Sequence, residues 1–329
     1  MKLAIIGSGW VGCHLANVFK DDHEVVLFDK DGFFSGSSWS NQNRLHLGFH
    51  YARNSQTREL CRKTFERFRL HYAEAVVPVS RNIYAIPERD SLLDFVTYMS
   101  IFDHESYSYN VVEIPELVGI EGAIDVPEMR IDPFAAKFMF ERSLGGIFVR
   151  SNIDSENILE LLSKFDLVVN CTNNVFCPIH DESFYEVALM LRYKKVRQTS
   201  FEALTLVDGR LFSIFPSNDG LYNLSSVQHT PAVIVERPDE IEASLRTMDI
   251  GRSVVDFEKV VERHYPEFKM DFQYDGFVTS IKSKFKSESS NRNPVIRQSG
   301  NLVSCYTGKI QGIYMIEDYV REELCSRRK

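Results

Sequence analysis

Residues 3–12 read LAIIGSGWVG, and they decide the fold that the rest of the chain is expected to adopt. Residues 3–6 form a short apolar run typical of a buried strand, and a GxGxxG turn follows at once. A helical pattern then runs to about residue 20, and a second strand over residues 24–28 ends on Asp29. This order of strand, glycine turn, helix, strand and acid is the fingerprint of a dinucleotide-binding unit.

Each glycine of this motif has its own physical role. Gly7 permits the tight turn out of the strand, Gly9 lets the backbone approach a pyrophosphate, and Gly12 lets the helix pack against the sheet. The helix start directs unpaired N–H groups and the positive end of its dipole towards the phosphates. Asp29 stands 20 residues after Gly9, where an acid reaches the ribose hydroxyls and disfavours a 2′-phosphate. NADP is therefore not expected, although the motif does not distinguish FAD from NAD.

The composition is that of an ordinary globular protein long enough for two domains. The chain has 329 residues, and 38 Lys and Arg against 46 Asp and Glu give a net charge of −8. We therefore expect neither nucleic acid nor an anionic membrane as a partner, and no apolar run approaches the roughly 18 residues of a membrane span. The six cysteines are scattered without a CxxC pair, so we expect reduced thiols, no metal site and a cytoplasmic location.

Two kinds of pattern divide the rest of the chain. Helical and strand signals alternate over residues 133–171 and return from residue 302, which favours a parallel sheet covered on both faces. Strand signals dominate from 185 to about 285, with Asp208-Gly209 as a hairpin turn, and they favour a mostly antiparallel sheet. Before both of these regions we expect a helix at 91–99 and a strand at 111–120. The predicted division is a discontinuous nucleotide-binding domain of residues 1–76, 127–184 and 293–329, and a substrate domain of residues 77–126 and 185–292.

Three later segments carry a further resemblance. Residues 35–51 read SGSSWSNQNRLHLGFHY, residues 166–172 read DLVVNCT, and residues 300–312 contain the turn TGKI. Together with the first segment they resemble the D-amino-acid-oxidase type of FAD-dependent oxidoreductase, which includes glycine oxidase, glycerol-3-phosphate dehydrogenase and 2-hydroxyglutarate dehydrogenase. The spacing within residues 35–51 is most similar to the 2-hydroxyglutarate dehydrogenase branch.

This resemblance implies FAD as the cofactor, a Rossmann-like FAD-binding domain and an α+β substrate domain. Family members have Thr-Gly or Ala-Gly where this chain has Thr172-Asn173, and asparagine tolerates a positive φ better than most residues. A helix start near Gly308 would offer N–H donors to the negative charge of reduced flavin, and Lys309 would add a full charge. The residues assigned to the cofactor are Gly7, Gly9, Trp10, Val11, Gly12, Asp29, Lys30, Ser37, Ser38, Asn43, Arg44, Leu45, Ile153, Thr172, Gly308, Lys309 and Ile310.

The candidate catalytic residues are His46 and His50, because histidine titrates near neutral pH and the resemblance places this segment beside the flavin. A hydrogen-bonded structural role is the alternative for each histidine. An acidic substrate needs cations, so Lys282 and Arg292 are candidates for substrate binding, with Tyr51 as a hydrogen-bond donor. Solvated charges in a loop are the alternative for the two cations. Covalent attachment of the flavin is not expected.

These residues together imply an FAD-dependent oxidase or dehydrogenase. It would remove a hydride from a carbon bearing an amine or a hydroxyl, in a small anionic or sugar-like substrate, and pass it to flavin N5. The alternatives are an NAD-dependent dehydrogenase, a flavoprotein with a mutase-like reaction, and a flavoprotein without catalytic activity. The identity of the substrate, the electron acceptor and the oligomeric state do not follow from the sequence.

Overall fold

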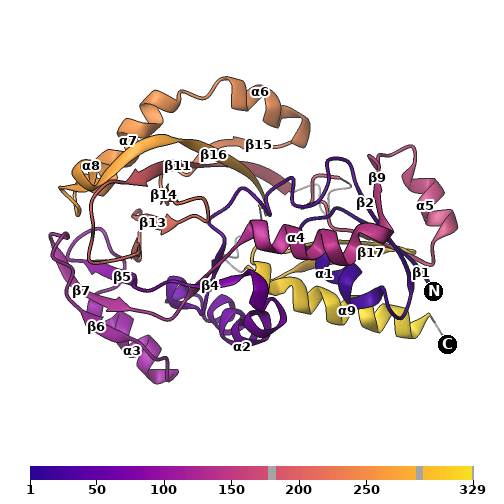
Figure 1. The fold of residues 1–329 in the computed structure, drawn as a ribbon, viewed down its shortest axis with the longest axis horizontal. Helices are drawn as coiled ribbons and strands as arrows, with labels where there is room; N and C mark the ends of the chain where they lie inside the picture. The colour runs from indigo at the N-terminus through magenta and orange to yellow at the C-terminus, as the bar shows by residue number, and fades with distance from the viewer. Residues whose placement is uncertain (177–182, 287–291, 328–329) are drawn as a thin grey trace.

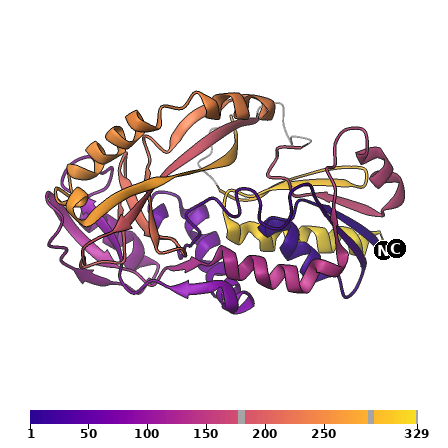
Figure 2. The ribbon, with the colours of Figure 1, turned by 45° about the horizontal axis from the view of Figure 1, so that its top comes forward.

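The computed structural model describes residues 1–176, 183–286 and 292–327 (Figure 1). Two large sheets lie towards opposite ends of an elongated molecule, and the two termini lie together at the end of the first sheet (Figures 1 and 2). The strands of the first sheet, in spatial order, are β17 (Val295–Ser299), β18 (Leu302–Tyr306), β10 (Leu167–Asn170), β1 (Lys2–Ile6), β2 (Glu24–Asp29) and β9 (Phe148–Arg150).

The first sheet is parallel apart from its edge strand β17, which runs antiparallel to β18. One face of β1 packs against α1 (Trp10–Phe19), α4 (Pro133–Leu144) and α9 (Ile313–Ser326), while the other face packs against α5 (Ile158–Lys164). A strand buried on both faces must be apolar throughout, as residues 3–6 are. The Asp132 side chain caps α4, since it accepts hydrogen bonds from the N–H groups of Phe134 and Ala135.

The second sheet is mostly antiparallel, with β12 and β5 as a parallel pair. Its longest strand pair joins β11 to β16. The other strands follow one another in the order β15-β11-β14-β13-β12-β5-β7-β6, and β16 is an additional strand paired with β11. The helix α7 (Ile250–Glu262) buries its apolar face against this sheet. The strands are β5 (Asn82–Pro87), β6 (Asn110–Val112), β7 (Ile120–Asp125), β11 (Ser183–Lys195), β12 (Ala203–Leu206), β13 (Phe212–Pro216), β14 (Leu221–Ser226), β15 (Pro231–Val235) and β16 (Phe272–Phe285).

A small third sheet, which the sequence did not predict, lies between the two larger ones (Figure 1). Its three antiparallel strands are β3 (Arg44–Leu45), β8 (Met129–Ile131) and β4 (Val76–Pro78). The remaining helices are α2 (Ser55–His71), α3 (Phe95–His104), α6 (Ile241–Arg246) and α8 (Phe268–Asp271). The division into two domains remains a proposal, and its expected boundaries at residues 76 and 127 fall at β4 and just before β8.

The predicted fold class is confirmed, because a parallel sheet with helices on both faces accompanies a mostly antiparallel sheet. The hairpin predicted at Asp208-Gly209 is confirmed by the antiparallel pairing of β12 with β13. The strand predicted over 111–120 is present only at its two ends, where β6 ends at Val112 and β7 begins at Ile120. Between them Pro115 lacks a donor and Gly119 turns the chain at a φ of +63°. The helix predicted at 91–99 begins later, since the Asp94 side chain caps α3.

Replacement of Gly12 by alanine is expected to destabilise the fold, because the new Cβ would lie 1.8 Å from the Gly7 carbonyl oxygen. Relief of this overlap would separate α1 from β1, and we expect a loss of about 3 kcal/mol in the free energy of unfolding. Urea unfolding measures the change. Gly145→Ala is the matched control, since its Cβ would meet no atom within 4 Å. Equal midpoints for the two variants would contradict the expectation.

Candidate active site

A cavity of about 1380 Å³ extends from the carboxyl edge of the first sheet to the inner strands of the second. Its walls include the ends of β1, β10 and β18 and residues of β11, β12, β13, β14 and β16. Ligand pockets usually measure about 300–1,000 Å³, so this volume suits a dinucleotide together with a second molecule. Its position also agrees with the rule that ligands bind beyond the carboxyl ends of parallel strands.

The glycine turn forms one end of this cavity. Gly7 has a φ of +100°, and a Cβ at this position would lie 2.9 Å from the Cys171 carbonyl oxygen. A Cβ on Gly9 would lie 2.7 Å from Ser38 Oγ, which accepts a hydrogen bond of 3.0 Å from Trp10 N. Bare backbone and the start of α1 therefore face the cavity, and this arrangement fits a pyrophosphate.

The acid at the end of β2 lines the same end of the cavity. Asp29 Oδ2 accepts a hydrogen bond of 2.7 Å from Ser8 N, and Oδ1 accepts one of 2.9 Å from Asp31 N. The carboxylate therefore connects the second strand to the glycine turn. Lys30 and Ile153 also line this end.

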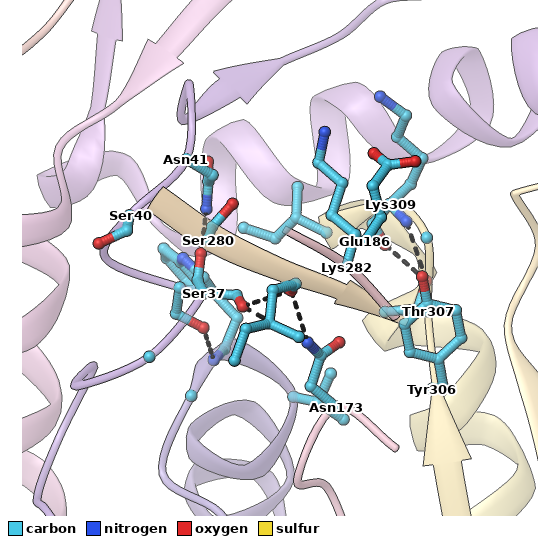
Figure 3. A pocket seen from close by; sticks show the side chains of 18 of the residues that line it. Ser37, Ser40, Asn41, Asn173, Glu186, Ser280, Lys282, Tyr306, Thr307 and Lys309 are labelled. Carbon is cyan, nitrogen blue, oxygen red and sulfur yellow. Dashed lines mark hydrogen bonds between the residues drawn. The ribbon is translucent and has the colours of Figure 1, made fainter. Parts of the chain in front are cut away.

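Two loops of the first sheet contact β16 of the second. Ser37 Oγ donates a hydrogen bond of 2.7 Å to the carbonyl oxygen of Ile281, and Asn173 Nδ2 donates one of 3.0 Å to the same atom (Figure 3). Asn173 has a φ of 56° and Asn174 a φ of 61°, so asparagine takes the left-handed conformation as expected. The departure from the Thr-Gly pattern of the family is therefore accommodated by the backbone.

A buried carboxylate that the sequence did not reveal organises the histidine segment. Glu128 accepts hydrogen bonds of 2.8, 3.0 and 3.2 Å from the consecutive N–H groups of residues 47–49. It also accepts hydrogen bonds from the Tyr84 hydroxyl at 2.7 Å and from His46 Nδ1 at 3.1 Å. Burial opposes the charge, but these donors outweigh it and lower the pKa of Glu128 to about 2. Glu128 is therefore ionised at neutral pH.

The ionised carboxylate fixes the tautomer of His46. Burial, reinforced by the charge of Lys309, lowers the pKa of His46 to about 4, so its ring is neutral at physiological pH. Because Glu128 can only accept, the ring proton lies on Nδ1, and Nε2 keeps a lone pair. A histidine in this state can accept a proton.

His50 lies beside His46, with 5.6 Å between the ring centroids. Its Nδ1 atom is buried and has no hydrogen-bond partner among the described residues. Burial and the neighbouring His46 hold the pKa of His50 well below its usual value, so this ring is neutral as well. The two histidines therefore differ, because Glu128 orients one and no described side chain orients the other.

Two cations lie near the histidines without a carboxylate partner in the described part of the chain. Arg44 donates a hydrogen bond of 2.8 Å to Thr205 Oγ1, and its guanidinium lies 4.0 Å from the ring centre of Phe215. Lys309 Nζ lies 4.5 Å from the ring centre of Tyr51. Burial, and then the charge of Arg44, lowers the pKa of Lys309 to about 7.

The two cations predicted to bind the substrate, Lys282 and Arg292, lie along the same cavity. Lys282 belongs to β16 rather than to a loop, and its side chain is exposed where it lines the cavity. Arg292 lies against the C-terminal turn, where a Cβ on Gly308 would be 3.1 Å from its Cδ. Figure 3 shows Lys282, Glu186 and Lys309 on one side of the pocket, away from Ser37 and Asn173.

The cavity brings together all the predicted site residues except two. Gly12 packs against Gly7 behind the cavity wall, and Leu45 is fully buried in the core of the first sheet. Among the described residues no group of three metal-binding side chains occurs, and no helix is long and apolar enough to cross a membrane. The five described cysteines are free, and Cys177 lies outside the described residues.

The geometry of the glycine turn, the acid of β2 and the long cavity defines a dinucleotide-binding protein with room for a second molecule, and the comparison with known families identifies the dinucleotide. The chain belongs to the DAO family, described as "FAD dependent oxidoreductase", whose model matches residues 2–308. The protein is therefore an FAD-dependent oxidoreductase, which decides between the two cofactors that the glycine motif left open.

Sequence relatives are found among fungal enzymes. The chain is 32% identical over 335 residues to "FAD-dependent monooxygenase FPY4" of Fusarium mangiferae, with 97% of this chain and 90% of the relative covered. It is 27% identical over 356 residues to "FAD-dependent monooxygenase kojA" of Aspergillus flavus, with 95% and 83% covered. Both relatives extend over nearly the whole chain.

Solved structures share the fold at much lower identity. Glycine oxidase from Geobacillus kaustophilus has a TM-score of 0.70 at 12% identity, with 97% of this chain and 93% of that chain covered. The amino acid oxidase NikD has a TM-score of 0.70 at 12% identity, with 96% and 91% covered. At this identity the structural similarity shows a shared fold.

Replacement of Gly9 by alanine is expected to weaken FAD binding, because the new Cβ would lie 2.7 Å from Ser38 Oγ and would displace this side chain from the glycine turn to which it is hydrogen-bonded. We expect at least a tenfold loss of affinity, equivalent to about 1.4 kcal/mol. Titration of the apoprotein with FAD, followed by flavin fluorescence, measures it. Gly146→Ala serves as the control, since no atom lies within 4 Å of its Cβ position. Unchanged FAD affinity in Gly9→Ala would contradict the assignment.

Proposed function

We propose that this enzyme oxidises a small anionic substrate at a carbon that bears an amine or a hydroxyl. The observation that carries the proposal is the presence of Arg44 and Lys309, without carboxylate partners among the described residues, beside the neutral His46. A buried cation without a counter-charge loses much of its solvation energy. A carboxylate or phosphate on the substrate would restore a favourable environment, and the fork of Arg44 suits either group.

The same residues suggest how the substrate is activated. Bound FAD would supply the hydride acceptor at N5. His46 Nε2 would accept the proton of the substrate hydroxyl or ammonium group, and Glu128 would stabilise the imidazolium that forms. Gly7, Gly9, Asp29 and the other predicted cofactor residues that line the cavity would hold the FAD, with Gly308 and Lys309 near the flavin.

A monooxygenase reaction is the second candidate, and the names of the fungal relatives favour it. In such a reaction one atom of O2 enters the substrate, and a separate reductant such as NADPH supplies two electrons. An oxidase or dehydrogenase takes both electrons from the substrate itself. The two reactions therefore differ in whether the substrate alone reduces the flavin.

An anaerobic titration of the purified holoenzyme separates these candidates. We expect a pool of amino acids, 2-hydroxy acids or acidic sugars to bleach the flavin absorbance without NADPH. Bleaching that requires NADPH, with incorporation of ¹⁸O from labelled O2, would support the monooxygenase instead. Turnover only after chemical reduction of the flavin, with an isomer as the product, would support a mutase-like role. A flavin that no pool reduces under either condition would contradict both oxidative proposals.

Replacement of Glu128 by glutamine tests the role of His46. An amide N–H facing Nδ1 would force the ring proton onto Nε2, and the proton acceptor would be lost. We expect the rate of flavin reduction, per bound flavin, to fall by about 10²–10⁴-fold. Glu317→Gln is the matched control, because Glu317 contacts His14 Nε2 at the same 3.1 Å and neither residue lines the cavity. Equal loss of rate in both variants would contradict the assignment.

The charge of Lys309 predicts a pH dependence. With a pKa of about 7 the ammonium group is present below pH 7 and is lost as the pH rises. Because kcat/KM reports the free enzyme, its value for an anionic substrate is expected to fall about tenfold per unit above that pKa. The pH profile of Lys309→Met, measured with the same substrate, is expected to lack this step. An identical step in both enzymes would assign it to another group.

A further inference from the structure

We propose that Lys282 and Arg292 form a second anion-binding subsite, so that the substrate carries two acidic groups. This inference rests on the proposed function and extends it from a single anionic group to a dianion. The second group is a carboxylate or a phosphate, since both accept hydrogen bonds from lysine and arginine.

Positive charges outnumber negative charges around the proposed substrate end of the cavity. The cations that line it there are Arg44, Lys282, Lys284, Arg292 and Lys309, and Glu186 is the lining carboxylate among the described residues. Glu128 lies behind the histidines and adds a second negative charge. Five cations against two carboxylates leave an excess of three positive charges, in a protein whose net charge is −8.

Glu186 forms its ion pair with Lys284 rather than with Lys282. The Glu186 carboxylate is buried and belongs to β11, while Lys284 lies two residues after Lys282 on β16. Lys282 pairs with Glu186 in the strand register, so its side chain shares that face of the sheet, but its Nζ forms no ion pair within the described ranges. Lys282 therefore presents its ammonium group to the cavity (Figure 3).

Arg292 brings a second cation to the same wall. Its side chain lies against the turn at Gly308, and its guanidinium has no carboxylate partner in the part of the chain that the structure describes. The next residue after Gly308 is Lys309, so the chain segments that carry these two cations meet at this turn, and both residues line the cavity. A dianion can therefore reach Arg44 and Lys309 with one group, and Lys282 and Arg292 with the other.

The cofactor phosphates do not account for this excess charge. The glycine turn and the start of α1 provide their own N–H donors at the other end of the cavity, next to Ser38. Lys282 and Arg292 lie instead near Glu186 and Gly308. Loss of their charges is therefore expected to weaken binding of a dianion and to leave FAD bound.

The test uses unreactive acids as probes of the holoenzyme. Succinate, glutarate and adipate are compared with butyrate, pentanoate and hexanoate of the same carbon number, and 3-phosphonopropionate and 4-phosphonobutyrate form a phosphorus series. Perturbation of the flavin absorbance and isothermal titration calorimetry report binding without turnover. We expect at least one dianion to bind about tenfold or more tightly than its monoanion, and the series that binds best identifies the second group.

Lys282→Met and Arg292→Met are expected to remove this preference and to leave monoanion binding and flavin content unchanged. Lys286→Met is the control, because Lys286 pairs with Glu236 at 2.9 Å outside the cavity. Equal binding of monoanions and dianions by the unmodified enzyme would overturn the proposal. So would loss of FAD from the two variants, which would assign the cations to the cofactor.

The subsite and the proposed oxidation fail in different ways. If dianions bind preferentially but no metabolite pool reduces the flavin, the oxidation is contradicted and the subsite stands. If monoanionic substrates reduce the flavin and no dianion is preferred, the oxidation stands and the subsite is contradicted.

Discussion

The Glu128 carboxylate is the contact on which the arrangement of the site depends. Three consecutive N–H groups after His46 turn towards it, and the hydroxyl of Tyr84 on β5 reaches it from the second sheet. Such a carboxylate replaces its lost hydration with oriented donors, so its removal would leave those donors unsatisfied in a buried place. The histidine segment and the second sheet are therefore held in one position by a single ionised group.

A second constraint is the separation of charge across the molecule. The protein is acidic overall, yet the end of its cavity beside His46 and Gly308 is lined by more cations than carboxylates. In a partly desolvated site these charges are weakly screened. Burial first, and then the charge of a neighbouring cation, lowers the pKa values of Lys309 and His46. The binding of an anion would reverse this effect and restore the charge of Lys309. Binding of an anionic substrate, as proposed, would therefore be coupled to protonation of Lys309.

The first thirty residues predicted the nucleotide-binding end of the structure well. Strand, glycine turn, helix and acid are contiguous there, so local spacing contains the information. Glu128 could not be found in this way, because its partners lie 79 to 82 positions earlier in the chain and on a separate strand. The third sheet was not predicted for the same reason. Its strands β3, β4 and β8 are two or three residues long, too short to give a sequence pattern, and they are recognisable only from their pairing with one another. Long-range pairing, rather than local propensity, decided these features.

One short segment of β16 connects the two ends of the site. The carbonyl of Ile281 accepts hydrogen bonds from the cofactor loops at Ser37 and Asn173, and the next residue is Lys282. Successive residues of a strand point to opposite faces, so a shift of this segment would move its backbone contact and its cation together. A rigid connection of this kind would place the cation at a fixed distance from the flavin loops. The loops at Ser37 and Asn173 and the strand that carries Lys282 are therefore joined by direct hydrogen bonds, although they come from distant parts of the chain.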